Sequence, residues 1–361
     1  MQFGLSEEQS LLQESIKRFL TNQAPLDAVR KIADGESTDG DIWSGLVDLG
    51  IPSLLINEAN GGLGLSSLDA AIVAETLGYH VTPSPFLSSA VIAPVVLQSA
   101  GQREDLLGSV ATGETRIGIA FTEAIGARAE IKVASANGVL NGQSLFVLDT
   151  DADCYLVATA EQTIHLVEAD ASGLEKKNLS TVDRTRSTCA LAYDNVPSEL
   201  ISEDPTIFHH ALDTALVTMA ADTLGTAQCA LDQAVAYSGQ REQFNRVIAS
   251  FQAVKHMCAE MAAALEPCRS MVWYAAHTLD ELPSEASMMA SHTKAHLSEV
   301  GQFVTRTATE VHGGMGFTDL VGLHYWFKRA GFNRQIMGSP EWLRQRAFQF
   351  QNLISNDASR S

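Results

Sequence analysis

The chain has 361 residues, of which 45% are hydrophobic, and it carries a formal net charge of −19. This length and apolar content predict a globular protein of two or three domains with a substantial core. The negative charge argues against nucleic acid and against an anionic membrane as partners, because both attract basic surfaces and repel acidic ones.

The first ten residues, MQFGLSEEQS, have neither the basic nor the apolar region of a signal peptide. No stretch of the sequence offers the ~18 uninterrupted apolar residues that a membrane span needs. We therefore expect a cytoplasmic protein. The cysteines are odd in number and lack CxxC spacing, which is typical of buried thiols and not of a disulfide frame or a zinc knot. They are Cys154, Cys189, Cys229, Cys258 and Cys268.

Residues 1–113 show helical spacing of apolar residues, interrupted by Gly, Pro and Ser. Ser6 is a candidate N-cap for the first helix, because an acidic turn and an apolar run follow it. A glycine loop at 61–64 precedes a second run of this kind, SSLDAAIVAETLGYH. We predict a helical N-terminal domain.

Residues 114–203 change to short alternating runs, among them RIGIAF, AEIKVA, CYLVATA, TIHLVEA and TCALAYDNV, separated by Asn-Gly, Asp and Gly. This pattern predicts a central antiparallel β-domain. In residues 204–361 the helical period returns, and the apolar residues of 254–272 form one face of a bundle helix. The predicted fold class is α+β, mainly α, with an N-terminal helical domain, a central β-domain and a C-terminal four-helix bundle.

Two polar segments interrupt the C-terminal helices. If one helix runs from Asp204 to about Gly239 and the next begins at Phe251, then Arg241 lies at a helix end and Gln252 at a helix start. Arg241 could simply balance the C-terminal end of a helix dipole, and Phe244 could fill the turn. The segment therefore has an ordinary structural interpretation as well as a functional one.

The second segment is EVHGGMGFTD, at 310–319. Adjacent glycines let a backbone approach a ligand closely, and free N–H groups at a helix start favour a phosphate. The segment does not follow a strand, which excludes the βαβ dinucleotide fingerprint. On its own this glycine pattern is a weak signal.

Together the two segments are a more specific signal than either is alone. The spacing Arg241-x-x-Phe244, Phe251-Gln252 and His312-Gly313-Gly314-x-Gly316-Phe317, on a helix–sheet–helix chain, resembles the acyl-CoA dehydrogenase family of flavoproteins. The likeness covers nearly the whole chain, including LSEEQSLLQESIKRFL and LGIPSLL. It implies FAD as cofactor, with the pyrophosphate and adenosine held across a subunit interface. The implied cofactor contacts are Arg241, Phe244, Gln252, Gly313, Gly314, Gly316 and, at the start of the β-domain, Thr122.

The resemblance also implies a reaction, the α,β-desaturation of an acyl-CoA thioester, with electrons leaving through an electron-transferring flavoprotein. A carboxylate must take the α-proton, and burial would raise its pKa enough for that task. Family members place this base at one of two positions. Here these hold Ala215 and Met337, or Gly338 if the alignment shifts by one residue. None of these residues is acidic, so the catalytic base is unknown.

Further departures lie on the side of the flavin ring. The family's Thr-Glu-Pro-Gly-x-Gly-Ser-Asp motif reads TEAIGARAE here, and its Trp-Ile-Thr motif reads Phe146-Val147-Leu148. The residues that would contact the FAD of a neighbouring subunit thus match the family pattern. Those that would contact this chain's own flavin ring and substrate differ from it. We hypothesise a subunit that pairs with a related, base-bearing subunit in an α2β2 complex. By analogy with two-gene members of the family, the acyl group would be bulky and steroid-like.

Two alternatives remain open. One is a self-sufficient homotetrameric dehydrogenase with Asp222 or Glu341 as an unusual base, and the other is a non-enzymatic scaffold on the same fold. His292 and His296 have the i, i+4 spacing of metal ligands, but Lys294 lies between them and no third ligand is evident. We expect that helix face to be solvated and predict no metal.

Overall fold

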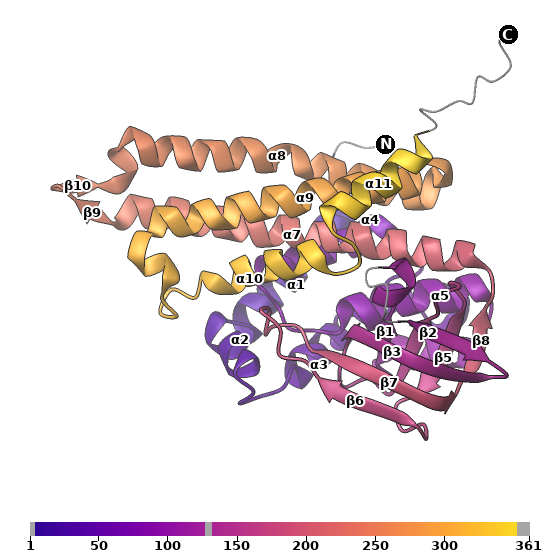
Figure 1. The fold of residues 1–361 in the computed structure, drawn as a ribbon. Coiled ribbons are helices and arrows are strands. Elements are labelled where there is room, and N and C mark those ends of the chain that lie inside the picture. The colour runs from indigo at the N-terminus through magenta and orange to yellow at the C-terminus, as the bar shows by residue number, and fades with distance from the viewer. Residues whose placement is uncertain (1–3, 127–131, 352–361) are drawn as a thin grey trace, which may run out of the picture.

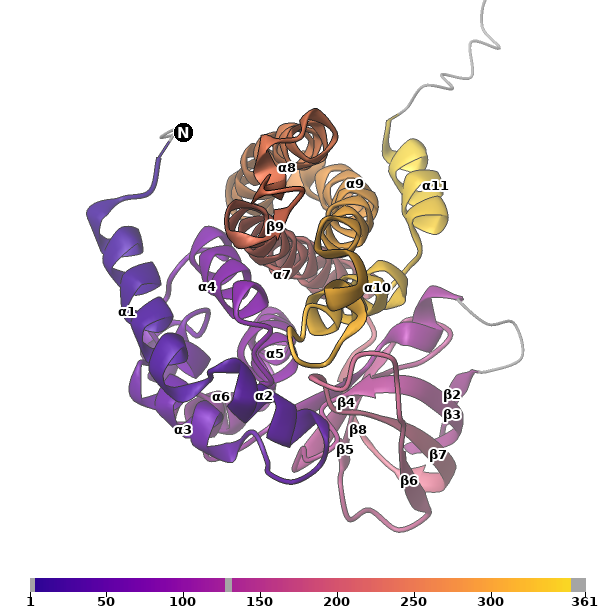
Figure 2. The same ribbon diagram turned by 90° about the vertical axis from the view of Figure 1, so that its left-hand side faces the viewer.

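The computed structural model describes residues 4–126 and 132–351. Long helices lie along one side of the molecule, with the sheet and the N-terminal helices beneath them (Figure 1). Seen along the long helices, the N-terminal helices and the sheet lie on opposite sides below the bundle (Figure 2). The helical, sheet, helical order confirms the predicted fold class. The boundaries after residues 113 and 203 stay a prediction.

Reciprocal side-chain caps begin two of the N-terminal helices. Ser6 caps α1 (Glu7–Gln23), where the Gln9 N–H donates to Ser6 Oγ at 3.1 Å and the Ser6 N–H donates to Gln9 Oε1 at 3.1 Å. Ser66 and Asp69 build the same reciprocal cap on α4 (Ser67–Tyr79). The remaining helices are α2 (Leu26–Ala33), α3 (Gly40–Asp48), a π-helical segment at Phe86–Ile92, α5 (Ala93–Ala100) and α6 (Glu104–Ala111).

The strands form one sheet, in the order β6-β7-β3-β1-β4-β5-β8 with β2 paired to β3. Its members are β1 (Ile117–Ala120), β2 (Val133–Ala136), β3 (Val139–Leu148), β4 (Cys154–Ala158), β5 (Ile164–Glu168), β6 (Leu174–Asn178), β7 (Thr188–Pro197) and β8 (Glu199–Ser202). The run AEIKVA lies partly outside the described residues, and β6 and β8 were not predicted.

One pairing departs from the expected antiparallel pattern. β1 runs parallel to β4, with Ile119 opposite Leu156, and antiparallel to β3. β3 and β4 follow one another through a short connection and therefore run in opposite directions. Because they lie on opposite sides of β1, one of them must be parallel to it.

The C-terminal bundle consists of α7 (Pro205–Gln240), α8 (Gln252–Glu281), α9 (Pro283–His312), α10 (His324–Gln335) and α11 (Pro340–Phe350). Asp204 and Phe251 are the N-caps of α7 and α8, as predicted. Between these helices a short hairpin, β9 (Glu242–Gln243) and β10 (Arg246–Val247), replaces the expected plain turn. In the described part of the chain, no helix is both long and apolar enough to cross a membrane.

The bundle meets the N-terminal helices at a close backbone contact. A Cβ on Gly78 of α4 would overlap the carbonyl of Asp222, and one on Gly225 of α7 would overlap the carbonyl of Glu75. The two helices can approach so closely only because both residues are glycine. All five cysteines are free, and only Cys258 is not fully buried, in agreement with the prediction.

Candidate functional site

The hairpin at the end of α7 presents the first polar segment at the far end of the bundle (Figure 1). Phe244 lies at the hairpin tip with a φ of 54° and is 87% exposed. Its ring contacts Phe251 edge-on, with centroids 6.1 Å apart, and the Arg246 guanidinium stacks on Phe251 at 4.0 Å. An exposed phenylalanine in a left-handed backbone gains little from its own chain. This geometry is typical of a contact surface for something else.

Arg241 and Gln252 flank this hairpin and are exposed. Arg241 ends α7, where its backbone N–H donates to the Tyr237 carbonyl at 2.9 Å. Within the described residues, its guanidinium makes no hydrogen bond or ion pair. Gln252 is the first residue of α8. The two side chains are therefore available to a ligand that approaches from outside this chain.

The glycine segment lies beside the hairpin. His312, the last residue of α9, is buried and stacks on Tyr237 of α7, with ring centroids 4.4 Å apart and an interplanar angle of 24°. Burial lowers the pKa of His312, so its ring is neutral at physiological pH and its Nδ1 donates to the Ala308 carbonyl at 2.8 Å. This stack joins the glycine segment to the last turn of α7, close to Arg241.

The glycines of this segment differ in how much open space surrounds their Cα atoms. Gly313 has a φ of 58°, and neither Gly313 nor Gly314 has any atom within 4 Å of the position a Cβ would occupy. Gly316 is buried, and a Cβ there would lie 2.7 Å from the Thr309 carbonyl oxygen. Phe317, at the end of the short helix Gly313–Phe317, is 78% exposed. The open backbone and the exposed ring fit a planar, anionic ligand such as a dinucleotide.

The two positions at which the family resemblance implies a base are buried and hold no acidic residue here. Ala215 and Met337 are at most 1% exposed. Met337 and Gly338 both have left-handed backbones, with φ of 54° and 113°. The buried Lys294 amine donates to the Gly338 carbonyl at 2.7 Å. Asp213, two residues before Ala215, is itself bound to Arg346 at 2.6 Å.

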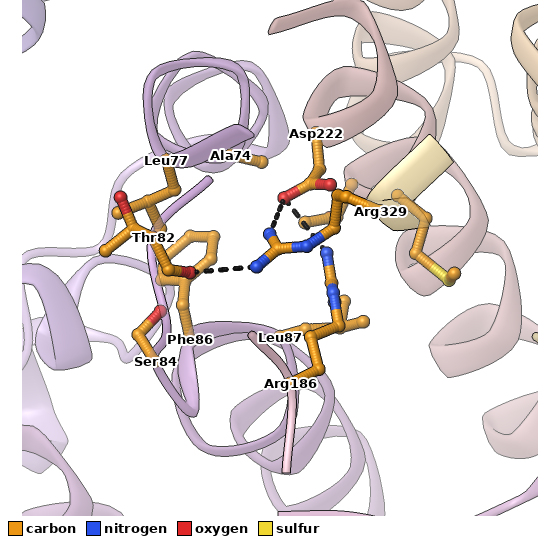
Figure 3. A pocket seen from close by; sticks show the side chains of 11 residues that line it. Ala74, Leu77, Thr82, Ser84, Phe86, Leu87, Arg186, Asp222 and Arg329 are labelled. Atoms are coloured by element: carbon orange, nitrogen blue, oxygen red, sulfur yellow. Dashed lines mark hydrogen bonds and ion pairs between the residues drawn. The ribbon is translucent and has the colours of Figure 1, made fainter. Parts of the chain in front are cut away.

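Asp222 is fully engaged by cations. Its Oδ2 lies 3.0 Å from Nη1 of Arg329 and 2.9 Å from Nη2 of Arg186 (Figure 3). Its Oδ1 accepts a hydrogen bond from the Asn333 amide at 2.6 Å. Burial alone would raise the pKa of Asp222, but Arg186 and Arg329 outweigh it and hold that pKa below the usual range. A carboxylate stabilised in this way is a poor proton acceptor.

This network also ties the three parts of the chain together. Arg329 of α10 donates from Nε to Asp183 of the sheet region at 2.8 Å and from Nη2 to the Thr82 carbonyl, after α4, at 3.2 Å. The cavity beside it, lined by Leu77, Phe86 and Met219 among others, has a volume of only about 20 Å³ (Figure 3). That volume is too small for any acyl group.

Glu341 does not resemble a buried base either. Its side chain is 66% exposed and lies 3.5 Å from Arg334. Hydrogen bonds at the start of α11, from its own backbone and from Ser339, lower the pKa of Glu341. A proton acceptor for this reaction needs a dry site and a raised pKa.

The described ring-side positions lie just after β1 and on β3. Thr122 is buried at the start of a short helix, Thr122–Ile125, directly after β1. The rest of the TEAIGARAE run lies partly outside the described residues. Phe146 has a φ of 53° at a register shift between Ser144 and Val147, so this strand bulges where the family has its Trp-Ile-Thr motif.

The histidine pair lies on α9 as the spacing indicates, and His296 is exposed. His292 lies 2.9 Å from the Gln351 amide. No group of three or more His, Cys, Asp or Glu that could hold a metal occurs in residues 4–126 and 132–351. Lys294, on the opposite face of the helix, is buried, so the solvated environment expected for this stretch is wrong for Lys294.

Comparison with known proteins identifies the family. The acyl-CoA dehydrogenase N-terminal domain matches residues 6–114, and the C-terminal domain matches residues 206–349. Acyl-CoA dehydrogenase IpdE2 of Mycolicibacterium smegmatis is 31% identical over 340 residues, which cover 93% of this chain and 96% of the relative. The chain belongs to the acyl-CoA dehydrogenase family. Its members are FAD-binding flavoproteins and oxidoreductases that act on CH–CH bonds.

Solved acyl-CoA dehydrogenase structures share the fold. A steroid ACAD, the Tcur3481–Tcur3483 G363A variant, is 26% identical, covers 96% of this chain and 98% of its own, and superposes with a TM-score of 0.87. The ChsE4–ChsE5 complex of Mycobacterium tuberculosis superposes with a TM-score of 0.88 at 23% identity, over 98% of this chain and 100% of its own. At that identity the second likeness concerns the fold alone.

Sequence reasoning missed several contributors to the site. The His312–Tyr237 stack and the Arg329 network join residues far apart in the chain, and no local pattern indicates such contacts. The one signal in the sequence was Arg329 itself, since an arginine at a core-facing position of a helix needs buried carboxylates as partners.

Proposed function

We propose that this chain is the subunit without a catalytic base in a heteromeric, FAD-dependent acyl-CoA dehydrogenase. The observation that carries the proposal is the closed base region. Ala215 and Met337 are buried apolar residues, and Asp213 and Asp222 are held by arginines. A related subunit would supply the carboxylate that removes the α-proton.

The fit to FAD rests on the open end of the bundle. Arg241 offers a guanidinium without a partner in the described part of the chain, suited to a pyrophosphate, because charge-assisted contacts of arginine with phosphate are strong. Phe244 and Phe317 offer exposed rings, and Gly313 and Gly314 leave room for close backbone approach. These groups would bind and orient the nucleotide part of FAD bound mainly to the partner subunit.

Bound FAD would supply the hydride acceptor for α,β-desaturation of the acyl-CoA thioester. In this arrangement the residues of this chain act by holding the cofactor, with Thr122 and Gly316 shaping its surroundings and Gln252 donating from the start of α8. The whole complex would be an α2β2 assembly in the cytoplasm, and its electrons would pass to an electron-transferring flavoprotein.

A steroid-type acyl-CoA is the proposed substrate class. Support comes from a similar solved structure described as a steroid ACAD, which is 26% identical to this chain.

The test is an Arg241→Ala variant co-expressed with the base-bearing subunit. Loss of a charge-assisted contact of about 1.5–3 kcal/mol should weaken FAD binding roughly 10- to 150-fold, with no change in the melting temperature measured without FAD. Flavin content and the Kd for FAD are the measurements. Arg18→Ala, on α1, removes the same charge from an exposed site and should leave both unchanged. Unchanged flavin binding in Arg241→Ala would favour a scaffold without a cofactor role.

A further inference from the structure

Lys294 is a buried amine in the middle of α9. Its side chain is 1% exposed, and its Nζ donates a hydrogen bond to the carbonyl oxygen of Gly338 at 2.7 Å. Within the described residues this is the only hydrogen bond of the amine, and it has no ion pair. A buried ammonium without a carboxylate is costly, so its presence calls for a physical reason.

The partner of this amine is a strained turn. Met337 has a φ of 54°, which is unfavourable for a residue with a side chain, and Gly338 follows with a φ of 113°. A Cβ on Gly338 would lie 2.6 Å from Cε3 of Trp342, so the turn packs tightly against the first turn of α11. The single hydrogen bond from Lys294 holds the carbonyl of this turn toward α9.

The charges on the neighbouring helices are already paired. Each nearby carboxylate lies close to an arginine. The pairs are Asp213–Arg346, Asp222–Arg329, Glu75–Arg269, Glu341–Arg334 and Glu299–Arg344. In the described part of the chain, the charged side chain that acts on Lys294 is Arg334, which repels its ammonium form. No counter-charge therefore stabilises a proton on this amine.

We propose that Lys294 is a proton-sensitive clamp that fixes the Met337–Gly338 turn and thereby the docking of α11. The neutral amine keeps its N–H donor for the Gly338 carbonyl without the cost of a buried charge. The ammonium form is accommodated only when the turn opens and the amine reaches water. Protonation of Lys294 therefore favours the open turn. The clamp does not depend on the proposed division of labour between subunits.

The direction of the effect follows from the two protonation equilibria. Burial first and Arg334 second lower the pKa of Lys294 from 10.5 to about 7 in the folded chain. Between these values the open or unfolded state binds a proton that the closed state does not, so the closed state gains stability as pH rises. The equilibrium constant for opening should fall about tenfold per pH unit across that window and level off below pH 7.

The experiment uses the purified full-length chain, or its complex if only the complex is obtained. Lysine carrying ¹³C at Cε is titrated by NMR, and urea unfolding is measured at several pH values between 7.5 and 9.5. We expect one lysine resonance with a midpoint near 7. We also expect the unfolding constant of the wild type to change about tenfold more per pH unit than that of Lys294→Met, which cannot titrate.

Lys294→Gln provides the matched variant, because it keeps an N–H donor but carries no titrating proton. Its unfolding should show the flat pH dependence of Lys294→Met with a smaller loss of stability. The proposal is overturned if every lysine resonance titrates near 10, or if both variants retain the pH dependence of the wild type. The NMR titration of the wild type decides the matter even if a variant fails to fold.

Discussion

The two ends of the candidate site obey opposite physical rules. At the hairpin and the glycine segment, Arg241, Phe244 and Phe317 are exposed, and no intrachain contact satisfies the Arg241 guanidinium in the described residues. Around Ala215 and Met337 the residues are buried, and the nearby charges are paired. The exposed end is available for contact with another molecule, whereas the buried apolar residues at the other end contribute to the core of this chain.

The largest expected loss of folding stability comes from removing Arg329 from its buried ion pairs. Arg329→Met would leave Arg186 as the only arginine paired with the buried Asp183 and Asp222 in the described residues. Breaking a buried ion pair in this way costs about 3–5 kcal/mol. Urea unfolding should show this loss. Arg306→Met removes an arginine that is 74% exposed and pairs with Glu310, and should change the free energy of unfolding by less than about 1 kcal/mol. Equal effects of the two variants would refute the structural role of the network.

A matched pair of glycine substitutions compares the two ends directly. Gly338→Ala places a methyl group 2.6 Å from the Trp342 ring in a left-handed backbone and should cost roughly 1–3 kcal/mol of folding stability. Gly314→Ala meets no atom within 4 Å and should leave folding nearly unchanged, while it hinders cofactor approach in the complex. Thermal unfolding and FAD affinity, measured on both, separate these outcomes. The comparison fails if Gly314→Ala is the less stable variant.

The smallest effect on folding is expected at the hairpin tip. Phe244→Asn removes a ring that is 87% exposed and introduces a residue that tolerates a positive φ. The free energy of unfolding should stay within about 0.5 kcal/mol of the wild type. Binding of FAD and of the partner subunit should nevertheless weaken, as measured by calorimetry and by gel filtration of the co-expressed complex. A large loss of stability would show that Phe244 serves its own chain.

Much of the fold follows from local patterns. The cap at Ser6, the helix starts at Asp204 and Phe251, and the alternation in the strands are each patterns that extend over only a few neighbouring residues. β6 was missed because its residues are mostly exposed and it reads LEKKN, which has no apolar alternation. The parallel β1–β4 pairing depends on which side of β1 the chain returns to, and strand patterns carry no such information.

The site divides in the same way. Arg241, Phe244 and the glycines were proposed as cofactor contacts from a spacing along the chain, and that assignment stays a prediction. Lys294 could not, because its two histidine neighbours indicated a solvated face, whereas its burial depends on the turn at Gly338, 44 residues away. The arginine network likewise depends on three segments that meet only in the folded chain.

The most direct test of the account is the flavin content and activity of the chain purified alone and together with the base-bearing subunit. The FAD-to-chain ratio is read from the absorbance of the flavin, and turnover from reduction of a dye with a steroid-type acyl-CoA. The account predicts little flavin and no turnover for the chain alone, and both in the complex. Stoichiometric FAD and desaturation by the chain alone would contradict it.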